Sequence, residues 1–101
     1  MIIFNVTSIV EDSVHQDFYN FMHDIYMPAV LASNKFADAK LFRLTEPVNE
    51  GVTYCAQYTA HSPADLEVYR NEYLPELHHR LMKQFPEKIV VFSSVLELTQ
   101  P

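Results

Sequence analysis

The spacing of hydrophobic and polar residues changes several times along this chain and marks out six elements. Runs rich in β-branched and aromatic residues, typical of β-strands, cover residues 2–10, 36–45, 52–60 and 88–98. Two further segments place apolar residues three and four positions apart, the period of a helix with one buried face, over residues 13–26 and 63–85. The pattern therefore predicts the order β-α-β-β-α-β.

The second helix carries the clearest local signal in the sequence. Ser62 can cap its free amides, Pro63 suits the first helical position, and Asp65 completes a capping box. Pro75 would clash inside a straight helix, so we expect a kink or break near residues 73–74. The predicted buried stripe of this helix consists of Leu66, Tyr69, Tyr73, Leu77, Leu81 and Phe85.

The first helix has a weaker start signal. Asp12 or Ser13 can act as its N-cap, and Ser13 has Gln16 three positions later, which matches a capping box. Because Pro28 disfavours helical geometry in the residue before it, we expect the helix to end near Tyr26 and an irregular turn to follow. The predicted buried face consists of Val14, Phe18, Phe21, Met22 and Ile25.

This order of elements is that of a ferredoxin-like α+β fold, in which two helices cover one face of a four-stranded antiparallel sheet. A length of 101 residues fits one domain, so we expect residues 1–101 to form a single ferredoxin-like domain. The two middle strands should be joined by a loop, because their connection contains Glu46, Pro47, Asn49, Glu50 and Gly51.

Two helices leave the other face of the sheet uncovered. In a strand with one solvent-exposed face, every second residue should be polar. The last strand breaks this rule, with Ile89, Val91 and Val95 on one side and Val90, Phe92, Leu96 and Leu98 on the other. We therefore expect a homodimer closed through the open sheet face. A different protein partner, or long side chains that mask this face, are the alternatives.

Composition excludes several classes of partner and site. The formal net charge of −6 gives no reason to expect a nucleic-acid partner. No apolar run approaches the ~20 residues of a membrane span, and no leader pattern precedes the first strand, so we expect a cytoplasmic protein without a membrane partner. A single cysteine, Cys55, rules out an intramolecular disulfide.

No catalytic motif stands out. The five histidines lack the i, i+4 spacing of metal ligands, and His78 and His79 diverge around a helix, so we expect no metal site. Cys55 reads as a buried structural cysteine within a strand. One glycine cannot build a phosphate-binding loop, and we expect no cofactor.

A polar and aromatic set remains as a candidate ligand cleft between helix and sheet. It consists of Asn5, His23, Tyr26, Arg43, Tyr54 and Tyr58. An arginine among tyrosines would suit an acidic or carbonyl-bearing ligand. The alternative, which the sequence favours, is that the tyrosines are core rings and that Arg43 lies on the surface.

The whole chain resembles a family of small bacterial proteins of unknown function with a ferredoxin-like fold, within the dimeric α/β-barrel superfamily. The matching segments are MIIFNVT (1–7), MPAVL (27–31), VTY (52–54) with QY (57–58), and FSSVLE (92–97). Where a glycine is expected before the second strand, this chain has Asn34, which can adopt the same left-handed geometry.

The superfamily includes cofactor-independent monooxygenases, haem-degrading enzymes and stress-response proteins. The resemblance implies a dimer whose sheets pack together and a possible cleft under the helices, but it carries no catalytic residue. The primary interpretation is thus a homodimeric domain of uncharacterised function that binds a small ligand or a protein partner. The alternative is a small monooxygenase-like enzyme that acts on an organic substrate in the cleft.

Overall fold

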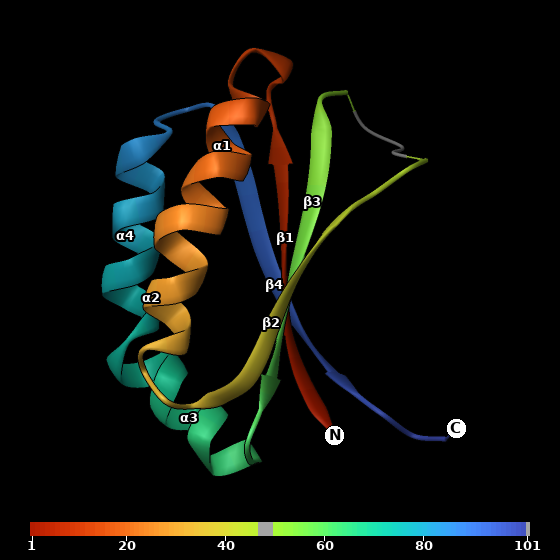
Figure 1. The fold of residues 1–101 in the computed structure, drawn as a ribbon, viewed down its shortest axis with the longest axis vertical. Helices are drawn as coiled ribbons and strands as arrows, with labels where there is room; N and C mark the ends of the chain where they lie inside the picture. Colours follow the sequence, from red (N-terminus) through yellow and green to blue (C-terminus); the bar gives the residue numbers. More distant parts are fainter. Residues whose placement is uncertain (47–49, 101) are drawn as a thin grey trace.

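The computed structural model describes residues 1–46 and 50–100 and has the predicted order of elements (Figure 1). Its four strands are β1 (Ile2–Val10), β2 (Phe36–Arg43), β3 (Val52–Ala60) and β4 (Ile89–Glu97). They form one antiparallel sheet in the order β2-β3-β1-β4. Pro47 and Asn49, part of the predicted loop between β2 and β3, lie outside the described residues.

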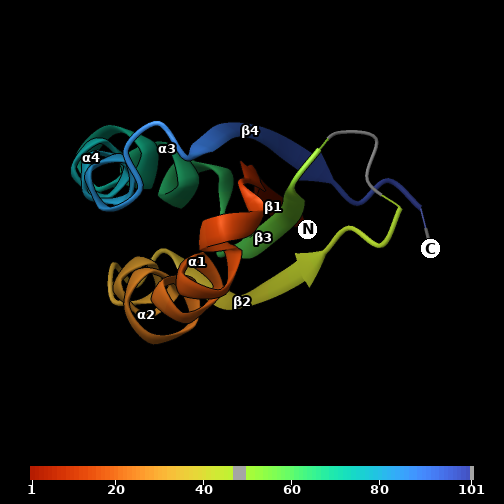
Figure 2. The same ribbon diagram turned by 90° about the horizontal axis from the view of Figure 1, so that it is seen from above.

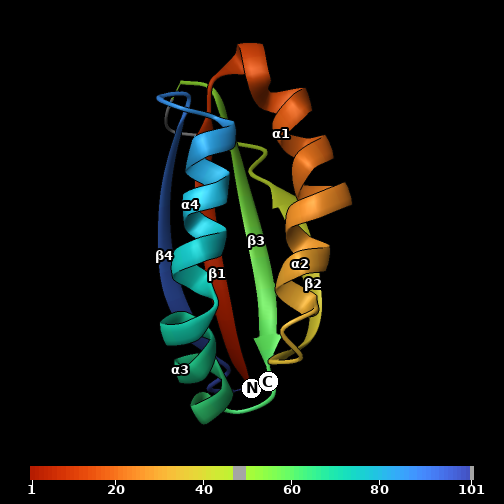
Figure 3. The same ribbon diagram turned by 90° about the vertical axis from the view of Figure 1, so that its left-hand side faces the viewer.

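The helices lie on one face of the sheet, and the opposite face is left open (Figures 1 and 2). They are α1 (His15–Phe21), α2 (Met27–Leu31), α3 (Pro63–Glu72) and α4 (Leu74–Gln84). Seen from the helix side, α1 and α2 stand over the β2 side of the sheet, and α3 and α4 over the β4 side (Figure 3). Within the described part of the chain, every helix is too short or too polar to cross a bilayer.

Aromatic rings from strands and helices meet at the centre of the core. Phe36 of β2 packs edge-on against Tyr69 of α3, with ring centroids 4.8 Å apart, and lies 5.4 Å from Tyr58 of β3. Phe4 of β1 contacts the same tyrosine of α3 at 6.0 Å. Such pairs add to the free energy gained from burying the rings. This cluster fixes the position of α3 over the sheet.

The first helix begins differently from the prediction. A 3-10 turn (η1, Asp12–Val14) precedes α1. In this turn the Val14 N–H donates a hydrogen bond to the Glu11 carbonyl over 3.1 Å. No side chain caps this turn or α1, so the predicted capping box of Ser13 and Gln16 is wrong. The backbone carbonyl of Glu11 accepts the hydrogen bond of an N–H group that a capping side chain would otherwise satisfy.

The same helix passes Pro28 without a break, because a π-helical turn (η2, Met22–Tyr26) precedes it and joins α1 to α2. In this turn the Met27 N–H donates to the carbonyl of Met22, five residues back. The wider turn accommodates a proline that has no N–H of its own. The predicted helix end near Tyr26 is therefore wrong, and the predicted irregular turn begins only after Leu31.

The π-helical turn also rotates the buried face of the helix. Its extra residue brings Tyr26 to the core, where 6% of the side chain is exposed, and turns Ile25 outward with 47% exposed. The prediction that Ile25 belongs to the buried face assumed an unbroken period of 3.6 residues. Phe18 and Met22, which precede the shift, are buried as predicted.

The second helix follows its sequence signals closely. The Ser62 Oγ accepts a hydrogen bond from the Asp65 backbone N–H over 3.1 Å, and Pro63 occupies the first turn. The predicted break falls at Tyr73, between α3 and α4, where φ is −114°. Tyr73 is exposed rather than buried, because the break removes it from the stripe and its ring stacks on that of Tyr69.

Two predicted turn residues adopt left-handed backbone geometry. Asn34 has φ of 63° before β2, so the asparagine does replace a glycine at this turn. Gly51 has φ of 87° before β3, and a Cβ atom there would lie 2.5 Å from the carbonyl oxygen of Val10. A side chain at position 51 would therefore be both strained and blocked.

The open face of the sheet carries apolar side chains on its two outer strands. They are Phe42 and Leu44 on the β2 side and Val90, Phe92, Leu96 and Leu98 on the β4 side, each 42% exposed or more. The two inner strands are more polar, with Asn5 hydrogen-bonded to Thr7 and Ser94 and with Thr7 near Cys55. The predicted apolar open face is therefore present, as two flanks around a more polar centre.

The N-cap of α3 gives a direct test of these local assignments. Replacement Ser62→Ala should lower the free energy of unfolding by about 1 kcal/mol, because the Asp65 N–H loses its acceptor. Ser13→Ala is the matched control and should have a smaller effect, since Ser13 caps nothing. Urea unfolding of the two variants would measure this, and equal losses would contradict the capping assignment.

Candidate functional site

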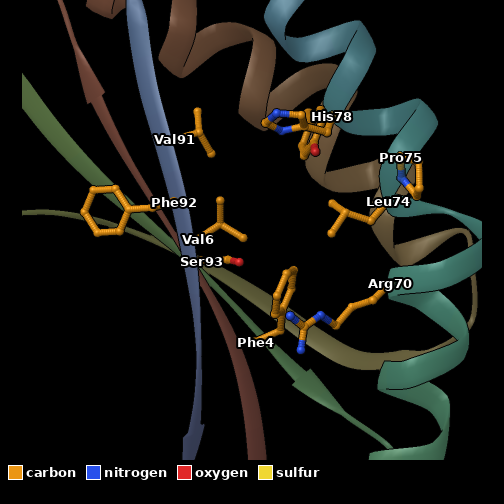
Figure 4. A pocket seen from close by; sticks show the side chains of 10 residues that line it. Phe4, Val6, Arg70, Leu74, Pro75, His78, Val91, Phe92 and Ser93 are labelled. Carbon is orange, nitrogen blue, oxygen red and sulfur yellow. The ribbon is translucent and has the colours of Figure 1, made fainter.

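A cleft of about 320 Å³ opens between the α3–α4 pair and strands β1 and β4 (Figure 4). We call it the α3–α4 cleft. Ten residues line it: Phe4, Val6, Tyr26, Arg70, Leu74, Pro75, His78, Val91, Phe92 and Ser93. Its volume lies at the lower end of the range of ligand pockets, roughly 300–1,000 Å³.

The floor of the α3–α4 cleft is apolar. Phe4 and Tyr26 are 1% and 6% exposed, and Val6 and Val91 are half-buried. Val6 and Val91 point into the space, whereas the ring of Phe92 points away toward the open face (Figure 4). Alternate residues of β4 thus serve opposite sides of the sheet. A ligand in the cleft would rest on hydrocarbon.

The mouth of the cleft carries two basic side chains from different helices. Arg70 comes from the end of α3, and its guanidinium carbon lies 5.7 Å from the centroid of the Phe4 ring. His78 comes from α4, and both side chains point toward the strands (Figure 4). The break at Tyr73 sets the two helices apart, and Leu74 and Pro75 beside it line the same space.

Tyr26 provides a neutral polar group in the cleft. Burial raises the pKa of its hydroxyl to about 12, and the positive charge of Arg80 acts weakly in the opposite direction. The hydroxyl therefore stays protonated at ordinary pH and can donate a hydrogen bond. It reaches this position because of the π-helical turn, which directs Tyr26 inward in place of Ile25.

Tyr58 lies in the core beside the site. Its side chain is 1% exposed, and its hydroxyl is buried with no hydrogen-bond partner among the described residues. Burial raises the pKa of Tyr58 well above its ordinary value, and the hydroxyls of Tyr26 and Tyr69 raise it further. A buried hydroxyl without a partner costs free energy, so Tyr58 contributes to stability mainly through its ring.

Arg43 and Tyr54, two of the predicted site residues, are partners across β2 and β3, away from the lining of the cleft. Arg43 is exposed, while Tyr54 is buried with its hydroxyl 3.1 Å from Nδ1 of His15. Burial raises the pKa of Tyr54, and the charge of Arg43 partly offsets this. Arg43 and Tyr54 thus form a pair on β2 and β3 that is separate from the cleft.

The remaining two candidates lie in other places. His23 is exposed on η2, where its Nδ1 lies 2.8 Å from Asp24 and its ring stacks on Tyr19. Asn5 lies on the open face and donates to Thr7 and Ser94. Of the six predicted site residues, only Tyr26 lines the α3–α4 cleft, so the structure does not gather the six into one site.

Sequence reasoning missed the two basic residues of the cleft. Arg70 and His78 lie on either side of the predicted helix break, in a segment that Pro75 forces out of a straight line. That break was the available signal, because a bend in a helix can open space against the sheet it covers. In the sequence, the pair His78 and His79 suggests only a metal ligand, and the spacing of the two argues against that role.

Among residues 1–46 and 50–100, no group of three or more His, Cys, Asp or Glu side chains could hold a metal ion. What the α3–α4 cleft offers is an apolar floor with a few convergent polar groups, the usual make-up of a small-molecule site.

Comparison with known families agrees with this structure. The sequence profile of a family described as a domain of unknown function, DUF4286, matches residues 1–99. The chain belongs to the DUF4286 family. No match was found among curated proteins.

Solved structures share the fold of this DUF4286 chain at low sequence identity. A dimeric ferredoxin-like protein from an uncultured marine organism has a TM-score of 0.68 and 10% identity, over 99% of this chain and 95% of that one. A dimeric ferredoxin-like protein of unknown function from Jannaschia sp. CCS1 has a TM-score of 0.60 and 15% identity, over 97% and 100%. SnoaB, a cofactor-independent oxygenase from Streptomyces nogalater, has a TM-score of 0.69 and 11% identity, over 99% and 94%. At these identities the likeness establishes the ferredoxin-like fold alone.

The two buried tyrosines of β3 should respond in opposite ways when their hydroxyls are removed. Tyr58→Phe should leave stability unchanged or raise it by up to ~1 kcal/mol, because the hydroxyl has no partner. Tyr54→Phe should lower stability by about 1 kcal/mol, because it removes the hydrogen bond with His15. Chemical denaturation of both variants would check this, and a large loss for Tyr58→Phe would reveal a missed partner.

Proposed function

We propose that this protein is a homodimer, closed through its open sheet faces, and that each subunit binds a small organic molecule in the α3–α4 cleft. The observation that carries the binding function is the composition of the cleft, an apolar floor beneath a mouth with Arg70 and His78. Surfaces of this kind favour compact organic ligands with at least one polar group.

The open face supports the homodimer. Four strands of eight or nine residues present a face on the order of the ~800 Å² that each partner buries in a standard interface. At ~25 cal/mol/Å² the gross gain exceeds the ~4–15 kcal/mol cost of association. Two solved structures with the same fold are described as dimeric, which supports a dimer here.

The open face is too apolar to be a typical solvent-exposed surface, and a second copy of the chain would cover it. Large apolar side chains on β2 and β4 are 42–61% exposed in a single chain, a pattern typical of interaction surfaces. A two-fold axis through the middle of the sheet would place these apolar flanks against their counterparts and leave the polar central residues between them.

A charge placed on one apolar flank should dissociate the dimer. Leu96→Asp would bury an unpaired carboxylate in the interface and should raise the dissociation constant about 100-fold or more. Ile25→Asp is the matched control, because Ile25 is equally exposed but lies on the helix layer, and this variant should remain dimeric. Light scattering after gel filtration would measure both. A monomeric wild-type chain at micromolar concentration would refute the proposal.

Filling the cleft should abolish ligand binding. Native mass spectrometry of freshly purified wild-type protein should reveal a retained small molecule, and Leu74→Trp should lose it because the larger ring occupies the cleft. Glu76→Trp adds the same ring at an exposed position of α4 outside the lining and should keep the ligand. Retention of the ligand by a folded Leu74→Trp variant would place binding elsewhere.

A monooxygenase-like enzyme is the second candidate, favoured by one feature of the cleft. His78 lines it, and histidine is the side chain that most often acts as a general base in enzymes. The same preparation distinguishes the two functions. An oxygenase would convert its retained molecule to a product with added oxygen during incubation in air, whereas a binding protein would release that molecule unchanged.

A further inference from the structure

No acidic side chain lies among the ten described residues that line the α3–α4 cleft. Arg70 is the one of the ten that carries a permanent positive charge. This local excess stands out in a chain whose formal net charge is −6. The cleft is therefore a basic site on an otherwise acidic protein.

Arg70 has no carboxylate partner among the described residues. Lys35 and Lys88 are each paired with an acidic side chain, at 3.6 Å from Asp65 and 3.0 Å from Glu11, whereas Arg70 forms no such pair. Glu67 lies one turn earlier on α3 and borders the outer side of Arg70, but it makes no ion pair with it. The guanidinium is thus available to an external anion.

The contact with Phe4 positions this guanidinium. Its carbon lies 5.7 Å from the ring centroid, within the distance of a cation–π contact. Because a cation–π contact acts on the positive charge and uses no particular N–H group, the guanidinium N–H groups remain available to form paired hydrogen bonds with a carboxylate. Phe4 belongs to the floor of the cleft, so a molecule held by Arg70 would lie next to apolar surface.

We propose that the natural ligand of the α3–α4 cleft is a small organic acid, whose carboxylate pairs with Arg70 and whose apolar part rests on Val6 and Val91. This inference rests on the proposed binding function and adds the charge class of the ligand. A volume of about 320 Å³ equals that of roughly ten water molecules, which limits the ligand to a compact molecule. The neutral hydroxyl of Tyr26 does not repel an anion and can donate to it.

A matched pair of probes tests the charge class directly. The probes are 2-naphthoate and its uncharged counterpart 2-naphthamide, titrated into the ¹⁵N-labelled chain of 101 residues and followed by NMR. In the wild type, the acid should bind at least tenfold more tightly than the amide. Shift changes should concentrate at cleft residues such as Leu74 and Val91.

Variants of the protein assign this preference to one side chain. Arg70→Met should reduce the affinity for the acid to that for the amide. Arg70→Lys should retain part of the preference, because it keeps the positive charge but lacks the planar guanidinium with its paired N–H donors. Lys83→Met removes one positive charge from an exposed site on α4 outside the cleft and should keep the full preference. Circular dichroism would confirm that each variant is folded.

The possible failures are distinguishable. Equal affinity for acid and amide, or an acid preference that survives in Arg70→Met, would overturn the charge assignment while leaving the binding function intact. Absence of binding by either probe at millimolar concentration would also overturn it. The retained-ligand measurement with Leu74→Trp would then decide the binding function independently.

Discussion

The fold depends on the central position of β1 in the sheet. This strand pairs with β3 along one edge and with β4 along the other, over all nine of its residues. Its inward side chains therefore lie beneath both helix pairs. Phe4 shows the result, since it packs in the aromatic core with Tyr69 and also forms part of the cleft floor beneath Arg70. Core and candidate site are built on the same strand.

The sequence predicted those features that depend on local chemistry or simple alternation. The cap at Ser62, the break at Tyr73, the left-handed Asn34 and the four-stranded antiparallel sheet all follow from neighbouring residues or from the βαββαβ pattern. The failures share one cause, a departure from regular helical geometry. The π-helical turn before Pro28 exchanged Ile25 for Tyr26 in the core, and no single-residue propensity signals such a turn.

The candidate site was harder to predict than the fold because its members are distant in sequence and ordinary in type. Arginine and histidine on a helix usually lie in solvent, and nothing in the neighbourhood of Arg70 distinguishes it from Arg80. Only the packing of α3 over β1 sets Arg70 above a phenylalanine ring. Tyr26 is a sequence candidate because it is aromatic and polar, but it lines the cleft because of the π-helical turn.

The pleat of β4 has a consequence for both surfaces of the sheet. Val91 faces the cleft, while Val90 and Phe92, its neighbours on either side, are exposed on the open face. A register slip of one residue against β1 would exchange these two sets of side chains. The hydrogen bonds between β1 and β4 thus fix the single register on which both the cleft and the open face depend. A shift of this edge strand that changed one of the two surfaces would also change the other.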